Sequence, residues 1–194
     1  MDERITALES MLDKTADLIA AVPADRLDTP TPCADYDVDG LLDHLATWVQ
    51  VFDSTVNGTP PTIDPTAPRI DGDRAVIFRA SADRIVAGLR DGGFERPMTM
   101  TENALPGEFV LDMLLMEYVG HGWDLSRALG IDHPYSDDEA TTALAAGSAI
   151  LEPQYRGTGM FDHEVEVADD APAIDRFVAF TGRHPDWRPA PART

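Results

Sequence analysis

The spacing of hydrophobic residues predicts helices along most of the chain. Apolar side chains recur at three- and four-residue steps over residues 3–21, as in an amphipathic helix, and this pattern ends before Pro23. The same period predicts further helices at about residues 37–56, 72–90, 107–129 and 137–151. Extended structure is suggested only at residues 97–101 and in the C-terminal region. The fold class that follows is mainly α.

Prolines separate the second and third predicted helices. Residues 57–71 contain Pro60, Pro61, Pro65 and Pro68, and this density of prolines is incompatible with regular structure. We therefore expect a long crossover between these two helices.

The pattern changes again after Pro153. From there to residue 170 the sequence indicates loop or strand, residues 171–181 predict one last helix, and residues 185–194 predict a loose tail. The residues behind the loop-or-strand interpretation are Gly157, Gly159, Val165 and Val167. We predict a helical bundle over residues 1–152 and a small, irregular C-terminal extension over residues 153–194 that packs on it.

Composition narrows the function classes. The chain has 194 residues, 43% of them hydrophobic, which is enough for a substantial core. Its formal charge of −20 argues against nucleic acid or an anionic membrane as a partner. No apolar run approaches the roughly 18 residues that cross a bilayer, and the first residues, MDERITALES, lack the features of a secretory signal. With Cys33 as the single cysteine, we expect a cytoplasmic protein.

A homodimer is also expected. Bundle helices that are apolar on more than one side often pair with a second copy of the same chain, and the first and fifth predicted helices are the candidates.

Three residues suggest a metal site. Glu117 and His121 are four residues apart in a predicted helix, so their side chains share one face and can converge on a cation. His44, in an earlier predicted helix, can supply a third ligand. A solvated Glu–His pair is the alternative, but all three residues stand in apolar segments, where ionisable groups need partners.

Two histidines and one carboxylate leave a coordination position open for water or substrate, as in catalytic rather than structural zinc sites. The nitrogen and oxygen donors suit zinc first, and also nickel or iron.

Other polar residues have competing interpretations. Cys33 can be a nucleophile, but it stands in a proline-rich turn without an adjacent histidine, so structural burial is favoured. Asp124 can accept a hydrogen bond from an imidazole, or instead cap a helix or pair with Arg127. Trp48 and Trp123 are expected in the core or in a pocket wall.

The remaining histidines and two C-terminal arginines are placed outside the site. His133, His163 and His184 are expected to be exposed in loops. Arg156 and Arg183 are expected to be ordinary ion-pair partners on an acidic protein.

Two segments carry a family resemblance. TPCADYDVDGLLDHL, residues 31–45, and HGWDLSRALG, residues 121–130, resemble the DinB/YfiT-like metal-binding superfamily. More narrowly, they resemble its actinobacterial branch of mycothiol-dependent maleylpyruvate isomerases and mycothiol S-transferases. AFTGRHPDW, residues 179–187, resembles the end of a short subfamily described only as metal-binding.

The resemblance implies a fold and a ligand set. The fold would be a four-helix bundle with a long crossover between its second and third helices. The metal ligands would be His44, Glu117 and His121. The C-terminal extension is smaller than the C-terminal domain of the maleylpyruvate isomerases, so their substrate does not transfer to this chain.

The function expected from this resemblance is thiol chemistry. A metal-dependent transferase or isomerase would use a low-molecular-weight thiol, mycothiol, against an electrophile, because a cation lowers the pKa of a thiol that it binds. A metal-dependent hydrolase and a non-catalytic metal-binding protein are the alternatives, and no motif in the sequence separates them.

Overall fold

The computed structural model describes residues 2–60, 63–66, 69–100, 103–157 and 161–189. The predictions that involve Pro61, Pro68, Thr101, Gly159 and residues 190–194 lie outside these ranges. Within them the helices are α1 (Asp2–Ala20), α2 (Val38–Asn57), α3 (Arg74–Arg90), α4 (Gly107–Leu129), α5 (Asp137–Ile150) and α6 (Ala173–Phe180), with short 3-10 turns η1 (Ala24–Arg26), η2 (Gly93–Glu95) and η3 (Pro153–Tyr155). Strands β1 (Met98–Met100) and β2 (Asn103–Leu105) form an antiparallel hairpin.

The helix ends follow from local chemistry. Asp37 caps α2, because its side chain accepts a hydrogen bond from the main-chain N–H of Gly40. Gly130 ends α4 in the left-handed conformation, with φ of 72°, which is costly for other residues. Ser136 and Glu139 form a complete capping box at the start of α5. The mainly α fold class predicted from the sequence is confirmed.

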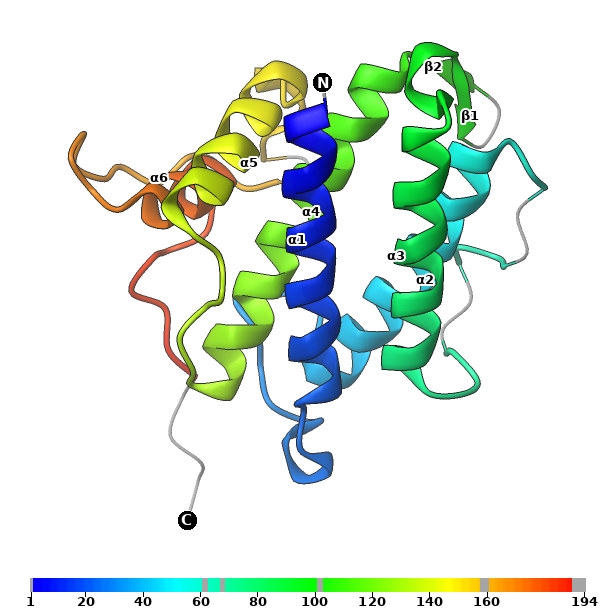
Figure 1. Ribbon diagram of the computed structural model, residues 1–194. Helices are drawn as coiled ribbons and strands as arrows, with labels where there is room; N and C mark the ends of the chain where they lie inside the picture. Colours follow the sequence, from blue (N-terminus) through cyan, green and yellow to red (C-terminus); the bar gives the residue numbers. More distant parts are fainter. Residues whose placement is uncertain (1, 61–62, 67–68, 101–102, 158–160, 190–194) are drawn as a thin grey trace.

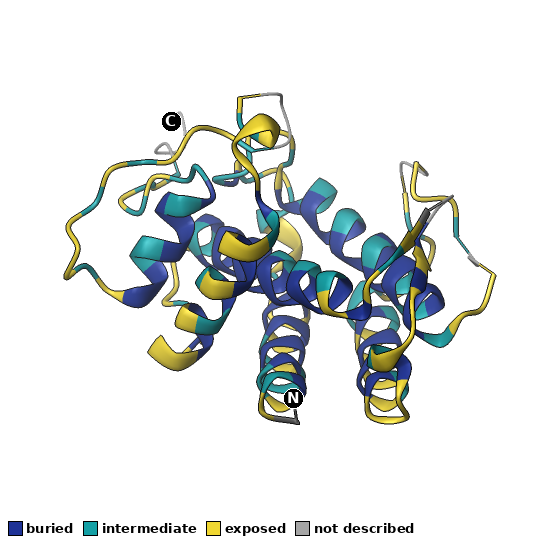
Figure 2. Ribbon diagram, turned by 90° about the horizontal axis from the view of Figure 1, so that it is seen from above, coloured by how far each residue is buried: buried dark blue, intermediate teal, exposed yellow. Residues whose placement is uncertain are grey.

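The first four helices form the bundle. Helix α1 packs on α3 and α4, and α2 packs on the same two helices, so each member has two neighbours (Figure 1). Figure 2 shows that buried positions lie where the helices face one another and exposed positions lie outside. The largest fully buried side chains include Trp123, Tyr118, Phe52 and Phe78.

The crossover from α2 to α3 has no regular secondary structure in its described parts, residues 58–60, 63–66 and 69–73. Its end is tied to α2 by Arg74, which donates to Asp43 and to Asp39 at 2.7 Å each. The crossover therefore returns the chain so that α3 lies against α2.

Helices α5 and α6 extend the bundle beside α4. Helix α5 packs on α4, and α6 packs on α5 (Figure 1). Residues 161–171 are irregular, and the loop is attached to α6 where the N–H of Val165 donates to the carbonyl oxygen of Ala179. This resolves the loop-or-strand alternative in favour of a loop for the described residues. The division into two units at residue 152 stays a prediction.

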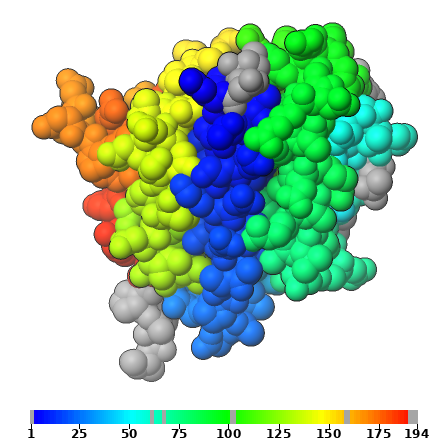
Figure 3. All heavy atoms as spheres, viewed as in Figure 1, coloured from blue at the N-terminus to red at the C-terminus, as the bar shows by residue number. Residues whose placement is uncertain are grey.

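The homodimer also stays a prediction. In the space-filling view α1 lies between α5 and α3 (Figure 3), and its larger apolar residues are buried within the subunit. The large apolar side chains that are exposed in the described part of the chain are Val76, Ile131 and Tyr155. None of the described helices is long and apolar enough to cross a membrane.

Candidate metal centre

The three predicted ligands come together between α2 and α4. His44 lies on α2, Glu117 and His121 lie on α4, and one ligand atom from each lies within 4.8 Å of the other two. Glu117 Oε1 is 2.8 Å from His44 Nε2 and 3.6 Å from His121 Nε2. The helical spacing and the packing of two neighbouring helices thus produce the cluster. That it binds a metal stays a prediction.

The orientation of both imidazole rings suits metal binding. Each ring uses Nδ1 for an outer partner: Tyr36 Oη lies 3.0 Å from His44 Nδ1, and Asp124 Oδ2 lies 3.0 Å from His121 Nδ1. Both Nε2 atoms therefore face Glu117. Outer hydrogen bonds of this kind fix the tautomer and the ring orientation of metal-ligating histidines. The donor set and its surroundings consequently fit a divalent cation.

Asp124 connects this centre to the C-terminal extension. Its side chain is fully buried, and Arg183 forms a bidentate ion pair with it: Nε is 2.8 Å from Oδ1 and Nη2 is 2.7 Å from Oδ2. Of the roles left open for Asp124, the structure shows the hydrogen bond with the imidazole. Pairing with Arg127 is wrong, because Arg127 lies over the Trp123 ring and donates to the carbonyl oxygen of Pro185. Arg183 is an ion-pair partner, as predicted, but it lies at the site rather than outside it.

The end of α6 explains how Arg183 reaches Asp124. The N–H of Arg183 donates to the carbonyl oxygen of Val178 and that of Gly182 to Ala179, the two bonds of a Schellman motif. Gly182 has φ of 89°, and a Cβ there would lie 2.9 Å from the main chain of Asp162. Only glycine fits both conditions. The turn therefore directs the following arginine back toward α4.

A cavity of about 560 Å³ opens beside the three candidate ligands. Its other lining residues come from the loop before α2, from α4 and from the extension: Cys33, Asp35, Tyr36, Met116, Gly120, Phe161, Thr181 and Arg183. Sequence patterns missed most of them, because they lie in loops, where no hydrophobic period marks which side chains face inward. The site is therefore larger than its three ligands and includes the extension.

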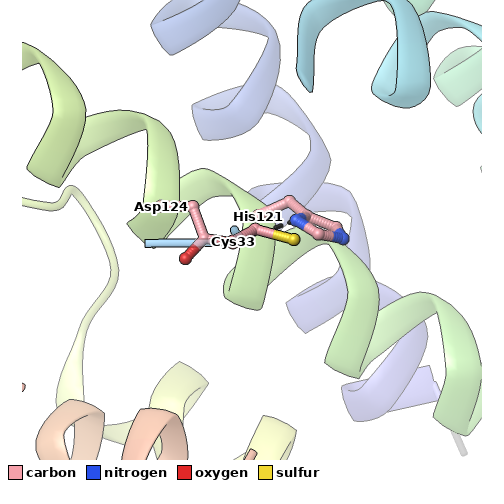
Figure 4. Close-up of side chains that lie close together, drawn as sticks. All are labelled: Cys33, His121 and Asp124. Carbon is pink, nitrogen blue, oxygen red and sulfur yellow. Dashed lines mark hydrogen bonds and ion pairs between the residues drawn. The ribbon is translucent and has the colours of Figure 1, made fainter. Parts of the chain in front are cut away.

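Cys33 is less buried than predicted. It is half-buried and lines this cavity, with Sγ within 4.8 Å of donor atoms of His121 and Asp124 (Figure 4). Burial raises the pKa of the Cys33 thiol, and the Asp124 carboxylate raises it further. The thiol is therefore protonated at neutral pH and is a weak nucleophile.

The charges in the site are set by its neighbours. Burial alone would raise the pKa of Glu117, but the charge of His121 and the hydrogen bond with His44 lower this pKa to about 2. Glu117 is thus an ionised carboxylate. Burial raises the pKa of Tyr36, so its hydroxyl keeps its proton.

The remaining candidates have structural roles. Trp123 is fully buried and Trp48 is half-buried beside His44, with ring centroids 6.2 Å apart. His133 is half-buried and stacks on Tyr135, so its predicted exposure is wrong. His163 and His184 are exposed, as predicted.

Arg156 also differs from its predicted role as an ion-pair partner. Its guanidinium lies 4.5 Å from the ring centroid of Phe180 and donates to the carbonyl oxygen of that residue at 2.6 Å. It holds the extension together rather than facing the cavity.

Comparisons with known proteins identify the family of this chain. The family profile described as the mycothiol maleylpyruvate isomerase N-terminal domain matches residues 8–126, which include the three candidate ligands and Asp124. Two relatives are each 30% identical over 172 residues, covering 88% of this chain and 92% of theirs. They are uncharacterized protein MT0763 of Mycobacterium tuberculosis strain CDC 1551 / Oshkosh and uncharacterized protein Rv0738 of strain H37Rv. No solved structure matches the chain significantly.

Proposed function

Because the chain belongs to the family of the mycothiol maleylpyruvate isomerase N-terminal domain, we propose that it is a metal-dependent transferase or isomerase that uses a low-molecular-weight thiol. Mycothiol is the thiol that the family name indicates. The observation that carries the proposal is the arrangement of His44 and His121, whose Nε2 atoms both face Glu117 at the edge of a cavity of about 560 Å³.

His44, Glu117 and His121 would hold the divalent cation, zinc in the first place. When bound, the cation would act as a Lewis acid and lower the pKa of an incoming thiol, so that the thiol loses its proton to solvent near neutral pH. The protein contributes two imidazoles and one carboxylate, and it keeps one side of the cluster open to the cavity.

Tyr36 would donate a hydrogen bond to the substrate. If His44 uses Nε2 for the cation, its Nδ1 carries the proton and donates to Tyr36 Oη, 3.0 Å away. The hydroxyl hydrogen of Tyr36 is then free to point into the cavity that this residue lines. An electrophile whose carbonyl oxygen gains negative charge when a thiol adds would be stabilised there.

Cys33 would not supply the nucleophile. Without a bound cation its raised pKa keeps the sulfur protonated, although the side chain faces the same cavity, and the Cys33→Ser variant tests whether this also holds with the cation bound. The nucleophile would be the sulfur of an exogenous thiol in this cavity. Because Cys33 is the single cysteine, its replacement distinguishes the two sources of sulfur.

Cobalt substitution tests the proposal. We expect the Co²⁺-loaded protein to develop a sulfur-to-metal charge-transfer absorption on titration with mycothiol. The band should persist in Cys33→Ser, which removes the only cysteine, and should be absent in His44→Ala and His121→Ala together with the bound metal.

Two results would contradict the proposal. A band that vanishes in Cys33→Ser would assign the sulfur to the protein. Thiols that bind no better than simple anions, combined with metal-dependent ester or amide hydrolysis, would favour the hydrolase instead.

A further inference from the structure

A second cavity adjoins the first one. It has a volume of about 180 Å³, and two of its lining residues, Met116 and Phe161, also line the cavity beside the candidate metal centre. Met116 is unbranched and directly precedes Glu117 on α4. A methionine side chain has three rotatable bonds and adapts to what it contacts, so it is a boundary that can rearrange.

The second cavity is more apolar than the first. Its hydrocarbon walls come from the first half of α4, from the end of α5 and from the extension: Phe109, Met113, Met116, Ile150, Leu151 and Phe161. Its polar members, Glu152 and Tyr155, are exposed residues of the loop after α5. A ligand in this cavity would therefore meet hydrocarbon inside and polar groups next to solvent.

A winding stripe on α4 joins the two environments. Phe109, Met113, Glu117 and His121 follow one another at four-residue steps, so each lies next to the one before it and the stripe turns gradually around the helix. Along this stripe the side chains change from apolar, in the second cavity, to candidate metal ligands, in the first. A molecule that lies along it would place a hydrocarbon group at one end and a reacting atom at the other.

The volume indicates the size of the hydrocarbon group. An apolar cavity of about 150 Å³ in another protein stays dry and binds benzene. At about 180 Å³, the second cavity suits an aryl ring or a short alkyl chain and is too small for a protein segment. Mycothiol carries hydroxyl-rich sugar groups, which belong in the larger cavity, where Asp35, Thr181 and Arg183 offer polar partners. The apolar group therefore belongs to the other reactant.

We propose that the second cavity binds an aryl or short alkyl group of the electrophile, whose reacting atom lies beside His44, Glu117 and His121. This inference rests on the proposed function for the identity of the reactant, but not for the binding of the apolar group itself. The substrate class is thus an electrophile with a polar reactive end and a hydrocarbon arm.

The binding is tested without metal or thiol. The probes are the straight-chain alcohols from 1-butanol to 1-octanol, titrated into protein labelled with ¹³C on its methionine methyl groups. We expect the signals of Met113 and Met116 to shift, while that of buried Met98, which lines neither cavity, stays in place. Each added methylene should tighten binding by about fourfold until the cavity is full.

Two matched substitutions locate the binding. Ile150→Asp places a carboxylate in the second cavity and should weaken 1-octanol binding by about tenfold or more. Ile131→Asp makes the same change at an exposed position and should leave the affinity unchanged. Ile150→Trp fills the cavity without a charge and should weaken binding as well, which provides a second variant if Ile150→Asp does not fold.

The inference is overturned if Met113 does not respond to the alcohols, if affinity is independent of chain length, or if the two aspartate variants weaken binding equally. The alcohols contain no thiol and the titration needs no cation. A failure here therefore removes only the apolar subsite. Loss of the cobalt–thiol absorption removes the proposed function and the assignment of the apolar group to an electrophile, but not the subsite itself.

Discussion

The ion pair between Arg183 and Asp124 can be removed by replacing either residue, and the structure indicates how much folding stability each substitution loses. Arg183→Met leaves the carboxylate of Asp124 fully buried, with His121 Nδ1 at 3.0 Å as its remaining partner. Breaking a buried pair by removing one member costs about 3–5 kcal/mol. For a chain of this length we expect the midpoint of thermal unfolding to fall on the order of 10 °C.

A double-mutant cycle isolates the interaction. Asp124→Asn alone should also be destabilising, because it leaves a guanidinium that is only 14% exposed without its counter-charge. The double variant Asp124→Asn, Arg183→Met leaves neither charge unpaired. Its loss of stability, measured by urea unfolding of the metal-free protein, should be smaller than the sum of the two single losses by at least about 1 kcal/mol.

The same substitutions should affect metal binding. Asp124 fixes the ring of His121, and Arg183 holds both oxygens of Asp124. Loss of such outer partners lowers metal affinity by about 10- to 100-fold. Competition with a chromophoric chelator measures this change. Arg127→Met is the matched control on α4: Arg127 donates to the main chain of Pro185, so its loss should leave the metal affinity unchanged.

Two results would refute this reasoning. One is additivity, in which the double variant loses the sum of the single losses. The other is a metal affinity in Arg183→Met equal to that of the wild type. Either would mean that Arg183 is a surface charge near the site rather than a residue that positions His121.

Two further predictions concern the core and the acid sensitivity of the fold. Gly122→Ala would place Cβ 1.7 Å from the buried hydroxyl of Tyr135, whereas Gly120→Ala on the same helix meets contacts no shorter than 3.8 Å. Thermal unfolding should show the first destabilised by about 2–3 kcal/mol and the second unchanged or stabilised, and equal shifts would contradict this. Burial raises the pKa of Glu139, but the hydrogen bond from Lys14 and other bonds outweigh it and hold the pKa below its ordinary value of 4.5. Their stabilisation is therefore present above pH 4.5 and lost as pH falls through the lower pKa of the folded state. The advantage of the wild type over Lys14→Met in urea unfolding should shrink as the pH falls below 4.5, and a constant advantage would refute this.

The helices and the three candidate ligands could be read from the sequence because both depend on local periodicity. Helix α4 runs from Gly107 to Leu129, the range predicted from its apolar pattern and its glycine ends. The spacing of Glu117 and His121 fixes their relative position on one helix. His44 needed the additional expectation that an apolar helix packs on its neighbours.

The outer residues of the site could not be predicted in this way. Arg183 follows a short helix and a glycine turn, and its partner lies 59 positions earlier in the chain. Cys33 and Tyr36 lie in the proline-containing loop before α2. The side chains in such segments are oriented by tertiary contacts rather than by a repeating pattern, so a sequence reveals the residue types there but not which of them face a cavity.

The bundle and the extension contribute different residues to the site. The bundle supplies the candidate ligands, and the family profile ends at residue 126, within α4. The extension supplies Arg183, Thr181 and Phe161 to the first cavity and one wall of the second. A change in the extension can therefore alter the shape of both cavities while the ligand set stays the same. Under the proposed function, relatives that share the ligands but differ after α5 would share the thiol step and differ in the electrophile. The reason is that Tyr155 and Phe161, which line the second cavity, lie beyond the residues that the family profile matches.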